Sequence, residues 1–483
     1  MGKNSEVLEG VLEEFGHLAA IPRKSGHEQA VSDFLKKYLT DAGFTVVQDA
    51  HNNIIADAPA SAGYEDAPRT ILQCHMDMVC VAKEGVSYDP LHDPIKLHRT
   101  DKYLEAVGTS LGSDDGSGVA EGVYILKHAK DHGPLRLIAT TDEEVNMTGA
   151  ISLDAKYLRD AKYLINCDSE NYDELTVGSA GSVNLDFYRK VSFEAPTALK
   201  AWKLTVRGLI GGHSGERIGD GRGNAIRTLA LAIRGIQKNG AVELASFHGG
   251  KAHNAIPNLA SAVFVLDQQE KDLQAVLQEE KARFMRIYGD VDPDIEFVLE
   301  PAAMPEKVLK AGDTERLLSL LTTLHTGVFA MSTVIPGLVE TSANLAVVTM
   351  DDDTVGVKYF PRSASDDKLD EILLAAETMG RLTGFTLKPG TKSPGWKENK
   401  NSRLAKLMPA IFKEQTGKEM KIETIHAGLE CGWHFQKNPE LDMVSIGVTT
   451  IDIHSPNEKL ILDTVEPQVN LILETLKRIA KGQ

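Results

Sequence analysis

The sequence has little of what marks several classes of protein. Its four cysteines, Cys74, Cys80, Cys167 and Cys431, form no CxxC pair and are too few for a disulfide scaffold, which suits a reducing compartment. No apolar run reaches the roughly 18 residues that a membrane span needs, and the polar segment MGKNSEVLEG lacks the pattern of a signal peptide. The net charge of −17 argues against nucleic acid or an anionic membrane as a main partner. A soluble cytoplasmic protein is therefore expected.

The stretch Ile71–Cys80 is the first with a clear chemical pattern. An apolar run, which we interpret as a buried strand, ends at His75, and Asp77 follows two residues later. Residues i and i+2 of an extended chain point to the same side, so both side chains can reach one point. An imidazole suits a metal such as zinc, and a neighbouring carboxylate can fix its tautomer. Taken alone, the pattern also fits a strand end with two solvated polar residues.

Two further apolar segments end in acidic residues. The predicted strand at 135–139 runs into Asp142, Glu143 and Glu144, and the strand at 163–167 ends at Asp168. Ligands of open α/β sheets bind at the carboxyl ends of the strands. We expect these acidic groups to meet there.

The glycine-rich stretch GTSLGSDDGSG lies between these strands. It lacks the lysine and the spacing of a phosphate loop. Instead it places Asp114 at the start of a predicted helix, where on its own an aspartate could simply cap the helix. Carboxylates packed together raise one another's pKa, and cations remove that repulsion. The whole set therefore predicts a metal site.

The chain length of 483 residues predicts two or three domains. From about Phe187 the pattern changes to strand, helix, strand, strand, helix, strand, which is ferredoxin-like in outline, with an imperfect second copy after it. We expect an α/β catalytic domain with a mixed sheet flanked by helices, formed from residues 1–186 and 392–483. Residues 187–391 would form an inserted α+β ferredoxin-like lid domain that closes over the site.

Seven short segments in order carry a resemblance to a known family: CHMD, GSDDGSG, TTDEE, NCDSE, GGHSGERIG, HAGLECG and IHSPNE. Together they resemble the cocatalytic metallopeptidase family of aminoacylases, glutamate carboxypeptidase, peptidase T and the dipeptidases. The resemblance covers nearly the whole chain and is strongest to the members that cleave aminoacyl-histidine (Xaa-His) dipeptides. The sequence departs slightly in having DDG where many members have DDK or DNG.

This resemblance implies a role for each residue of the expected metal site. Two divalent ions would be bound, most simply zinc, although manganese and cobalt accept the same ligands. Asp77 would orient an imidazole, and Glu143 would be the general base, although spacing alone allows Glu143 to be a third acidic ligand. The implied metal ligands are His75, Asp114, Glu144, Asp168 and His454.

The resemblance also implies residues that act on the substrate. His213 would stabilise the oxyanion, although a lone histidine in a glycine loop could be a turn residue. Asn254 and Arg362 would bind substrate, or would be surface or capping residues. Glu430 would meet a free amine beside His426, or would form a buried salt bridge.

The implied function is hydrolysis of Xaa-His and related unblocked dipeptides, carnosine included. An N-acyl-amino-acid deacylase with the same metal chemistry is the alternative, and a metal-binding scaffold without catalysis is a third. The sequence leaves open whether the chain is a monomer or a homodimer.

Overall fold

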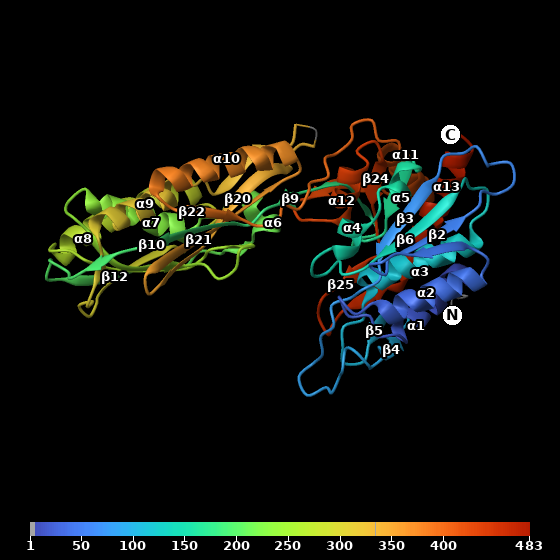
Figure 1. The fold of residues 1–483 in the computed structure, drawn as a ribbon, viewed down its shortest axis with the longest axis horizontal. Helices are drawn as coiled ribbons and strands as arrows, with labels where there is room; N and C mark the ends of the chain where they lie inside the picture. Colours follow the sequence, from blue (N-terminus) through green and yellow to red (C-terminus); the bar gives the residue numbers. More distant parts are fainter. Residues whose placement is uncertain (1–4, 334) are drawn as a thin grey trace. The chain divides into compact units, whose positions relative to one another are not determined.

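A computed structural model describes residues 5–333 and 335–483. The first residues of the polar segment that lacks a signal-peptide pattern, 1–4, lie outside this description. The chain divides into two compact units, here called unit 1 and unit 2 (Figure 1). Unit 1 contains the segment that ends at Gly178 together with Glu398–Thr424 and Leu429–Gln483, and unit 2 contains Ser179–Lys397 and Ile425–Gly428.

Unit 1 is built on an eight-stranded mixed sheet. In spatial order its strands are β1 (Thr45–Gln48), β2 (Ile54–Ala58), β6 (Leu135–Thr140), β3 (Thr70–His75), β7 (Tyr163–Asn166), β24 (Asp442–Ser445), β8 (Glu174–Ser179) and β23 (Lys421–Ile425). The four central strands β6, β3, β7 and β24 are parallel, and their outer neighbours β2 and β8 run antiparallel to them. The mixed α/β fold predicted from the sequence is confirmed.

The central strands explain why these segments of the sequence are mostly apolar and do not alternate with polar residues. Every residue of β3, β6 and β7 is buried, because parallel strands covered on both faces have no solvent side on which polar residues could alternate. Since β6, β3 and β7 are parallel neighbours, their carboxyl ends meet at one edge. The acidic and histidine residues that follow them are thereby brought together, as expected.

The helices of unit 1 cover this sheet. They are α1 (Glu6–Ala19), α2 (Gln29–Asp41), α3 (Ser113–His128), α4 (Thr148–Ser152), α5 (Lys156–Arg159), α11 (Leu404–Thr416), α12 (Glu430–Lys437) and α13 (Val465–Ala480). Helix α3 packs on β3 and contacts α1 and α13. The segment between β3 and α3 supplies β4 (Leu97–Arg99) and β5 (Tyr103–Ala106), which form a small sheet with β25 (Thr450–Ile451) and β26 (Lys459–Ile461).

Unit 2 is built on a ten-stranded sheet. Its main path is β17 (Glu296–Pro301), β12 (Ala201–Arg207), β16 (Ala260–Val265), β14 (Glu243–Gly249), β20 (Val339–Asp351), β21 (Thr354–Ser363), β10 (Leu185–Lys190) and β22 (Thr386–Pro389). Strands β9 (Gly181–Ser182) and β19 (Gly327–Met331) pair with β21 and β20. Two short pairs lie outside this sheet, β11 (Phe193–Glu194) with β18 (Val308–Leu309) and β13 (Gly212–His213) with β15 (Ala255–Ile256).

The predicted strand and helix order of the insert is confirmed. In chain order the first copy consists of β12, α7 (Ala225–Gln237), β14, β16, α8 (Glu270–Tyr288) and β17. In the sheet, its first strand β12 lies between β16 and β17. The second copy repeats this arrangement with α9 (Ala311–Thr323) and α10 (Asp366–Thr383), and takes β10 as its first strand. These helices lie along one face of the sheet, apart from the short α6 (Ser214–Arg217) (Figure 1).

The sequence boundary at 186/187 falls inside β10. Five of the six residue pairs that join β10 to β21 lie on or beyond Asp186, and the whole strand belongs to unit 2.

Among the described residues no helix is both long enough and apolar enough to cross a membrane. Cys74 and Cys167 are both buried.

Candidate metal centre and its surroundings

The candidate site lies at the carboxyl edge of the unit 1 sheet. His75 is the last residue of β3, Asp168 comes two residues after β7, and Glu143 and Glu144 follow β6. Asp114 lies at the start of α3, where its backbone dihedrals are not yet helical. The last member of the predicted ligand set, His454, lies in the turn between β25 and β26 with a positive φ of 55°.

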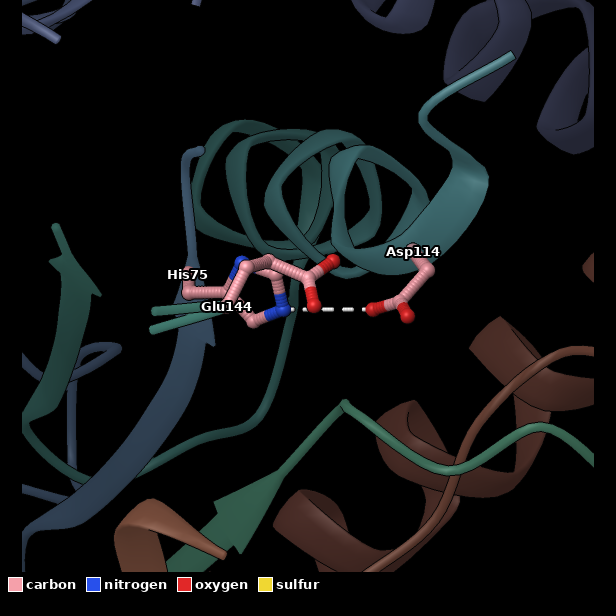
Figure 2. A group of neighbouring side chains, drawn as sticks. All are labelled: His75, Asp114 and Glu144. Atoms are coloured by element: carbon pink, nitrogen blue, oxygen red, sulfur yellow. Dashed lines mark hydrogen bonds and ion pairs between the residues drawn. The ribbon is translucent and has the colours of Figure 1, made fainter. Parts of the chain in front are cut away.

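The first group of donors surrounds His75. Its Nε2 lies 3.1 Å from Oδ1 of Asp114 and 3.4 Å from Oδ1 of Asp168. Figure 2 shows the imidazole on the end of β3 facing the Asp114 carboxylate at the start of α3. His75 is 1% exposed as a side chain and Asp168 8%, so the three donors are withdrawn from bulk water.

The second group of donors uses the other oxygen of Asp114. Oδ2 of Asp114 lies 3.1 Å from Nε2 of His454, and Oε2 of Glu144 lies 2.9 Å from the same nitrogen. Asp114 therefore presents one oxygen to each histidine. A carboxylate placed in this way can be shared by two ions.

The donor spacing suits metal ions. Imidazole nitrogens and carboxylate oxygens lie about 2.0–2.2 Å from a zinc ion, so two donors on one tetrahedral ion are about 3.4 Å apart. The four nitrogen-to-oxygen distances in the two groups run from 2.9 to 3.4 Å. The chemistry of the donors and their spacing thus both fit a pair of divalent ions.

Asp115 is a neighbouring carboxylate to which sequence reasoning gave no role. With His75 and Asp168 it forms a group whose ligand atoms lie within 4.8 Å of one another. However, its Oδ2 accepts the backbone N–H of His75 and its Oδ1 accepts that of Gly118. Both oxygens already hold the backbone, which makes Asp115 a support for His75 and leaves Asp168 as the freer donor.

The pKa of each of these groups is set by burial and by the neighbouring members of the site. Burial raises the pKa of Asp168 to about 6, against the opposing effect of His75. Hydrogen bonds that His454 donates to the carboxylates of Asp114 and Glu144 raise its pKa to about 10. Burial would raise the pKa of Asp114, but hydrogen bonds from His454 and His75 outweigh it and hold that pKa below its usual range. Protonated histidines therefore supply the positive charge that ions would supply when bound.

Asp77 contacts both the His75 ring and the backbone of Glu143 and Glu144. Its Oδ1 lies 3.3 Å from Nδ1 of His75, on the side of the ring away from Asp114. Its two oxygens also accept the backbone N–H groups of Glu143 and Glu144, at 3.1 and 3.3 Å, and Oδ2 accepts the hydroxyl of Ser25. This placement agrees with the predicted orienting role.

Glu143 lies beside the donor groups rather than within either of them. Its Oε2 is 3.9 Å from Nε2 of His75, longer than the contacts of Asp114 and Asp168 with that nitrogen. Burial raises the pKa of Glu143 well above its usual range, and the carboxylates of Asp168 and Glu430 add to the effect. A carboxyl group with a raised pKa is suited to proton transfer near neutral pH.

Glu430 is placed differently from the expectation that it meets a substrate amine. It is fully buried, and its Oε2 accepts hydrogen bonds of 2.6 Å from both Gln73 Nε2 and Thr140 Oγ1. Burial raises its pKa to about 8. An amine-binding role would need exposure that this side chain lacks. Its hydrogen-bond partners are neutral, and among the described residues no cation forms the alternative buried salt bridge with it.

Comparison with known proteins places this donor arrangement in a family. The sequence pattern of peptidase family M20/M25/M40 matches residues 71–478, which include every residue of both donor groups. The chain belongs to this family.

Two relatives resemble this M20/M25/M40 peptidase over almost its whole length. It is 33% identical to the cytosol non-specific dipeptidase of Escherichia coli K12 over 468 residues, which cover 96% of each chain. Its structure is similar to the crystal structure of aminoacylhistidine dipeptidase from Vibrio alginolyticus, with a TM-score of 0.93 and 32% identity over 98% of each chain. The fold is also similar to that of an aminopeptidase from Bacillus cereus, with a TM-score of 0.56, 16% identity and coverage of 98% and 99%.

Unit 2 of this M20/M25/M40 peptidase gathers a second set of predicted residues around a buried cation. Arg362, on β21, is 7% exposed and stacks on the ring of Phe360 with 4.7 Å between its guanidinium carbon and the ring centroid. Burial lowers the pKa of Arg362 to about 10. Within 5–333 and 335–483, no carboxylate forms an ion pair with it, and its Nε has no hydrogen-bond partner.

Two of the predicted histidines lie close to this cation. Burial and the charge of Arg362 lower the pKa of His213 and lower that of His426 to about 3. His426 shares a 2.7 Å hydrogen bond with the Ser342 hydroxyl. The group formed by Arg362, His213 and His426 therefore carries a positive charge on Arg362 and is suited to binding an anion. Asn254 is adjacent, since its backbone carbonyl accepts the N–H of Ser214.

Sequence reasoning missed two buried charged residues that bind backbone groups next to the candidate metal ligands. Arg23 is 1% exposed and donates to the carbonyls of Met76, Asp77 and Gly112. Glu458 is 3% exposed and accepts four backbone N–H groups where the chain enters α3. Glu458 is the last residue of the segment IHSPNE, whereas Arg23 lies outside all seven segments that carry the resemblance.

Proposed function

We propose that this M20/M25/M40 peptidase hydrolyses Xaa-His and related unblocked dipeptides, carnosine included, with a pair of divalent ions. The observation that carries the proposal is Asp114, which presents one oxygen to His75 and the other to His454. The dipeptide class is supported by two relatives that match nearly the whole chain, a non-specific dipeptidase and an aminoacylhistidine dipeptidase.

The proposed ions are zinc, with manganese or cobalt as alternatives that the same nitrogen and oxygen donors accept. His75, Asp114 and Asp168 would hold one ion, and Asp114, Glu144 and His454 the other. When bound, such ions lower the pKa of a water molecule from about 15.7 toward about 7 and polarise the scissile carbonyl.

The protein's own residues would carry the remaining steps. Glu143 would take the proton of the attacking water and pass it to the leaving amine, since its raised pKa favours both holding and releasing a proton. Asp77 would keep the His75 ring in the orientation in which Nε2 faces Asp114. Because Asp77 also holds the N–H groups of Glu143 and Glu144, one carboxylate would fix ligand and base together.

Recognition of the substrate would involve the group around Arg362. A buried guanidinium without a carboxylate partner is costly, and an anionic ligand would relieve that cost. We assign it the substrate's terminal carboxylate, with His426 beside it, and retain Asn254 as a further substrate contact. His213 would donate to the oxyanion, since burial and Arg362 lower its pKa and favour the neutral imidazole, whose N–H can still donate.

Replacement of Arg362 tests this assignment. We expect Arg362→Ala to lower kcat/KM for Ala-His by about 30- to 3,000-fold, the range for removing one partner of a buried charged hydrogen bond. The same variant should cleave Ala-His amide about as well as the unmodified enzyme does, because that substrate has no terminal carboxylate. Steady-state kinetics on both substrates measures the difference. Equal losses on the two substrates would contradict a contact with the carboxylate.

The proposed function itself is tested by a panel of substrates. The metal-loaded protein is assayed on β-Ala-His, Ala-His, Gly-Gly and N-acetyl-His, with and without a chelator. We expect hydrolysis of the dipeptides with a free amine, and loss of that hydrolysis when the ions are removed. Cleavage of N-acetyl-His in preference to the others would favour the deacylase, and no cleavage of any of them would favour a scaffold without catalysis.

Location and assembly complete the proposal. We propose the cytoplasm, supported by the name of the Escherichia coli relative and by four cysteines without a disulfide. We also propose a homodimer, which size-exclusion chromatography with light scattering would test directly. A monomer at assay concentration would refute the homodimer without affecting the proposed chemistry.

A further inference from the structure

The carboxylate of Glu458 is bound by four consecutive backbone N–H groups. Its Oε2 accepts those of Leu111 and Gly112 at 2.8 and 3.0 Å. Its Oε1 accepts those of Ser113 and Asp114 at 2.7 and 3.3 Å. Hydrogen bonds between backbone N–H groups and a carboxylate are charge-assisted and stronger than those between neutral groups. The segment 111–114, here called the Asp114 loop, therefore wraps around this one side chain, and its last two residues begin α3.

Glu458 also connects two distant segments that both carry a candidate metal ligand. It follows His454 by four residues, in the turn between β25 and β26, whereas the loop it binds ends at Asp114. These segments are separated by more than 300 residues of sequence. His454 and Asp114 are the pair whose side chains approach to 3.1 Å in the second donor group.

Arg23 holds the same loop from a different element. Its guanidinium donates to the carbonyl of Gly112, and also to the carbonyls of Met76 and Asp77 just after His75. The segment 111–114 thus gives its N–H groups to an anion, and its Gly112 carbonyl to a cation. Arg23 fixes this segment to the His75 strand, whereas Glu458 connects it to the segment that carries His454, together with a 2.9 Å hydrogen bond between the hydroxyls of Ser113 and Thr450.

We propose that Glu458 is a positioning residue, which ties the His454 turn to the Asp114 loop and so forms the second metal position. The inference rests on the proposed metal centre and deepens it. Glu458 is neither a ligand nor a base in this proposal, because both of its oxygens are engaged by backbone and it is 3% exposed. Removing its charge would let the His454 turn move away from Asp114 and Glu144.

Calorimetric titration with Mn²⁺ alone tests the proposal without any assay of activity. In Glu458→Gln the amide nitrogen cannot accept two of the four N–H groups. We expect one Mn²⁺ to bind about 10- to 100-fold more weakly, the range for residues that orient metal ligands, while the affinity for the other Mn²⁺ is kept within about 3-fold. The matched control Asn457→Ala, at the exposed neighbouring position, should bind both ions as the unmodified protein does.

A second variant identifies which ion is affected. His454→Ala should keep only the ion held by His75, Asp114 and Asp168. Adding Glu458→Gln to it should change that remaining affinity by less than about 3-fold, because the turn that Glu458 positions no longer carries a ligand. An equal weakening of both ions in Glu458→Gln, or a further large loss in the double variant, would overturn the proposal.

Two safeguards keep the result clear. If Glu458→Gln does not fold, Glu458→Asp keeps the charge on a shorter side chain and should show a smaller loss confined to the same ion. Equal or absent losses in that variant would also overturn the proposal. If the unmodified protein binds two Mn²⁺ but cleaves no dipeptide, the proposed function fails, while the positioning role of Glu458 is still decided by the titration.

Discussion

Glu143→Gln is expected to lower kcat by about 100- to 10,000-fold, the range for loss of a general acid–base group. The glutamine keeps the shape of the side chain but cannot accept the proton of the attacking water. Since Glu143 lies 3.9 Å from the His75 nitrogen, beyond the closer donors, we expect the metal content to stay at two ions per chain. KM should change little, because the group acts on the water. Stopped assays of dipeptide hydrolysis and metal analysis of the same sample measure both effects.

The adjacent Glu144 provides the matched comparison. Glu144→Gln makes the same chemical change one residue away, but Glu144 lies 2.9 Å from His454 within a donor group. We expect this variant to lose one ion, and to recover part of its activity when the metal concentration is raised. Glu143→Gln should not respond to added metal. If instead Glu143→Gln lost an ion, Glu143 would be the third acidic ligand that the sequence alone left open.

The sequence contained most of the information on how the site is assembled in unit 1. Mostly apolar runs before His75, Glu143 and Asp168 predicted buried strands, and parallel strands bring their carboxyl ends to one edge. The acidic residues could be placed there because this argument needs only local pattern and the direction of strands. His454 could not be reached in this way, since no buried strand of that kind precedes it, and it was identified through the resemblance.

The residues that sequence reasoning missed share one physical property. Arg23, Asp115 and Glu458 all bind backbone groups of segments remote in sequence or across a turn. A backbone N–H or carbonyl has the same identity at every position, so no residue pattern indicates which side chain will bind it. Glu430 was misplaced for a related reason, because its burial depends on Gln73 and Thr140 from two other strands.

In unit 2, local sequence pattern likewise predicted the elements but not which strands pair with one another. The pattern after Phe187 predicted the strands and helices of the insert, because each has its own periodicity. The first strand of the second copy, β10, precedes the first copy in sequence, and it is joined to its partners β21 and β22 only in space. A break in local pattern therefore indicated a boundary near the strand, but not the unit to which the strand belongs.

Asp114→Asn is expected to disable both metal positions at once. The asparagine has one carbonyl oxygen where Asp114 has two, and its amide nitrogen is no ligand, so at most one of the contacts with His75 and His454 can be replaced. The lost negative charge also removes one of the two carboxylates that raise the pKa of His454 to about 10. We expect the protein to retain one ion or none, with a loss of activity above about 100-fold, beyond the range for residues that only orient ligands.

Asp452→Asn makes the same chemical change two residues before His454, and serves as the control. Asp452 is exposed and has a positive φ of 54°, a conformation that asparagine also adopts readily. This variant should bind two ions and keep its activity, because only the charge of the turn has changed. Metal analysis after gel filtration, with activity measured on the same samples, gives the comparison. Two tightly held ions in Asp114→Asn would show that the histidines do not depend on a shared carboxylate, because the two donor groups would then bind their ions separately.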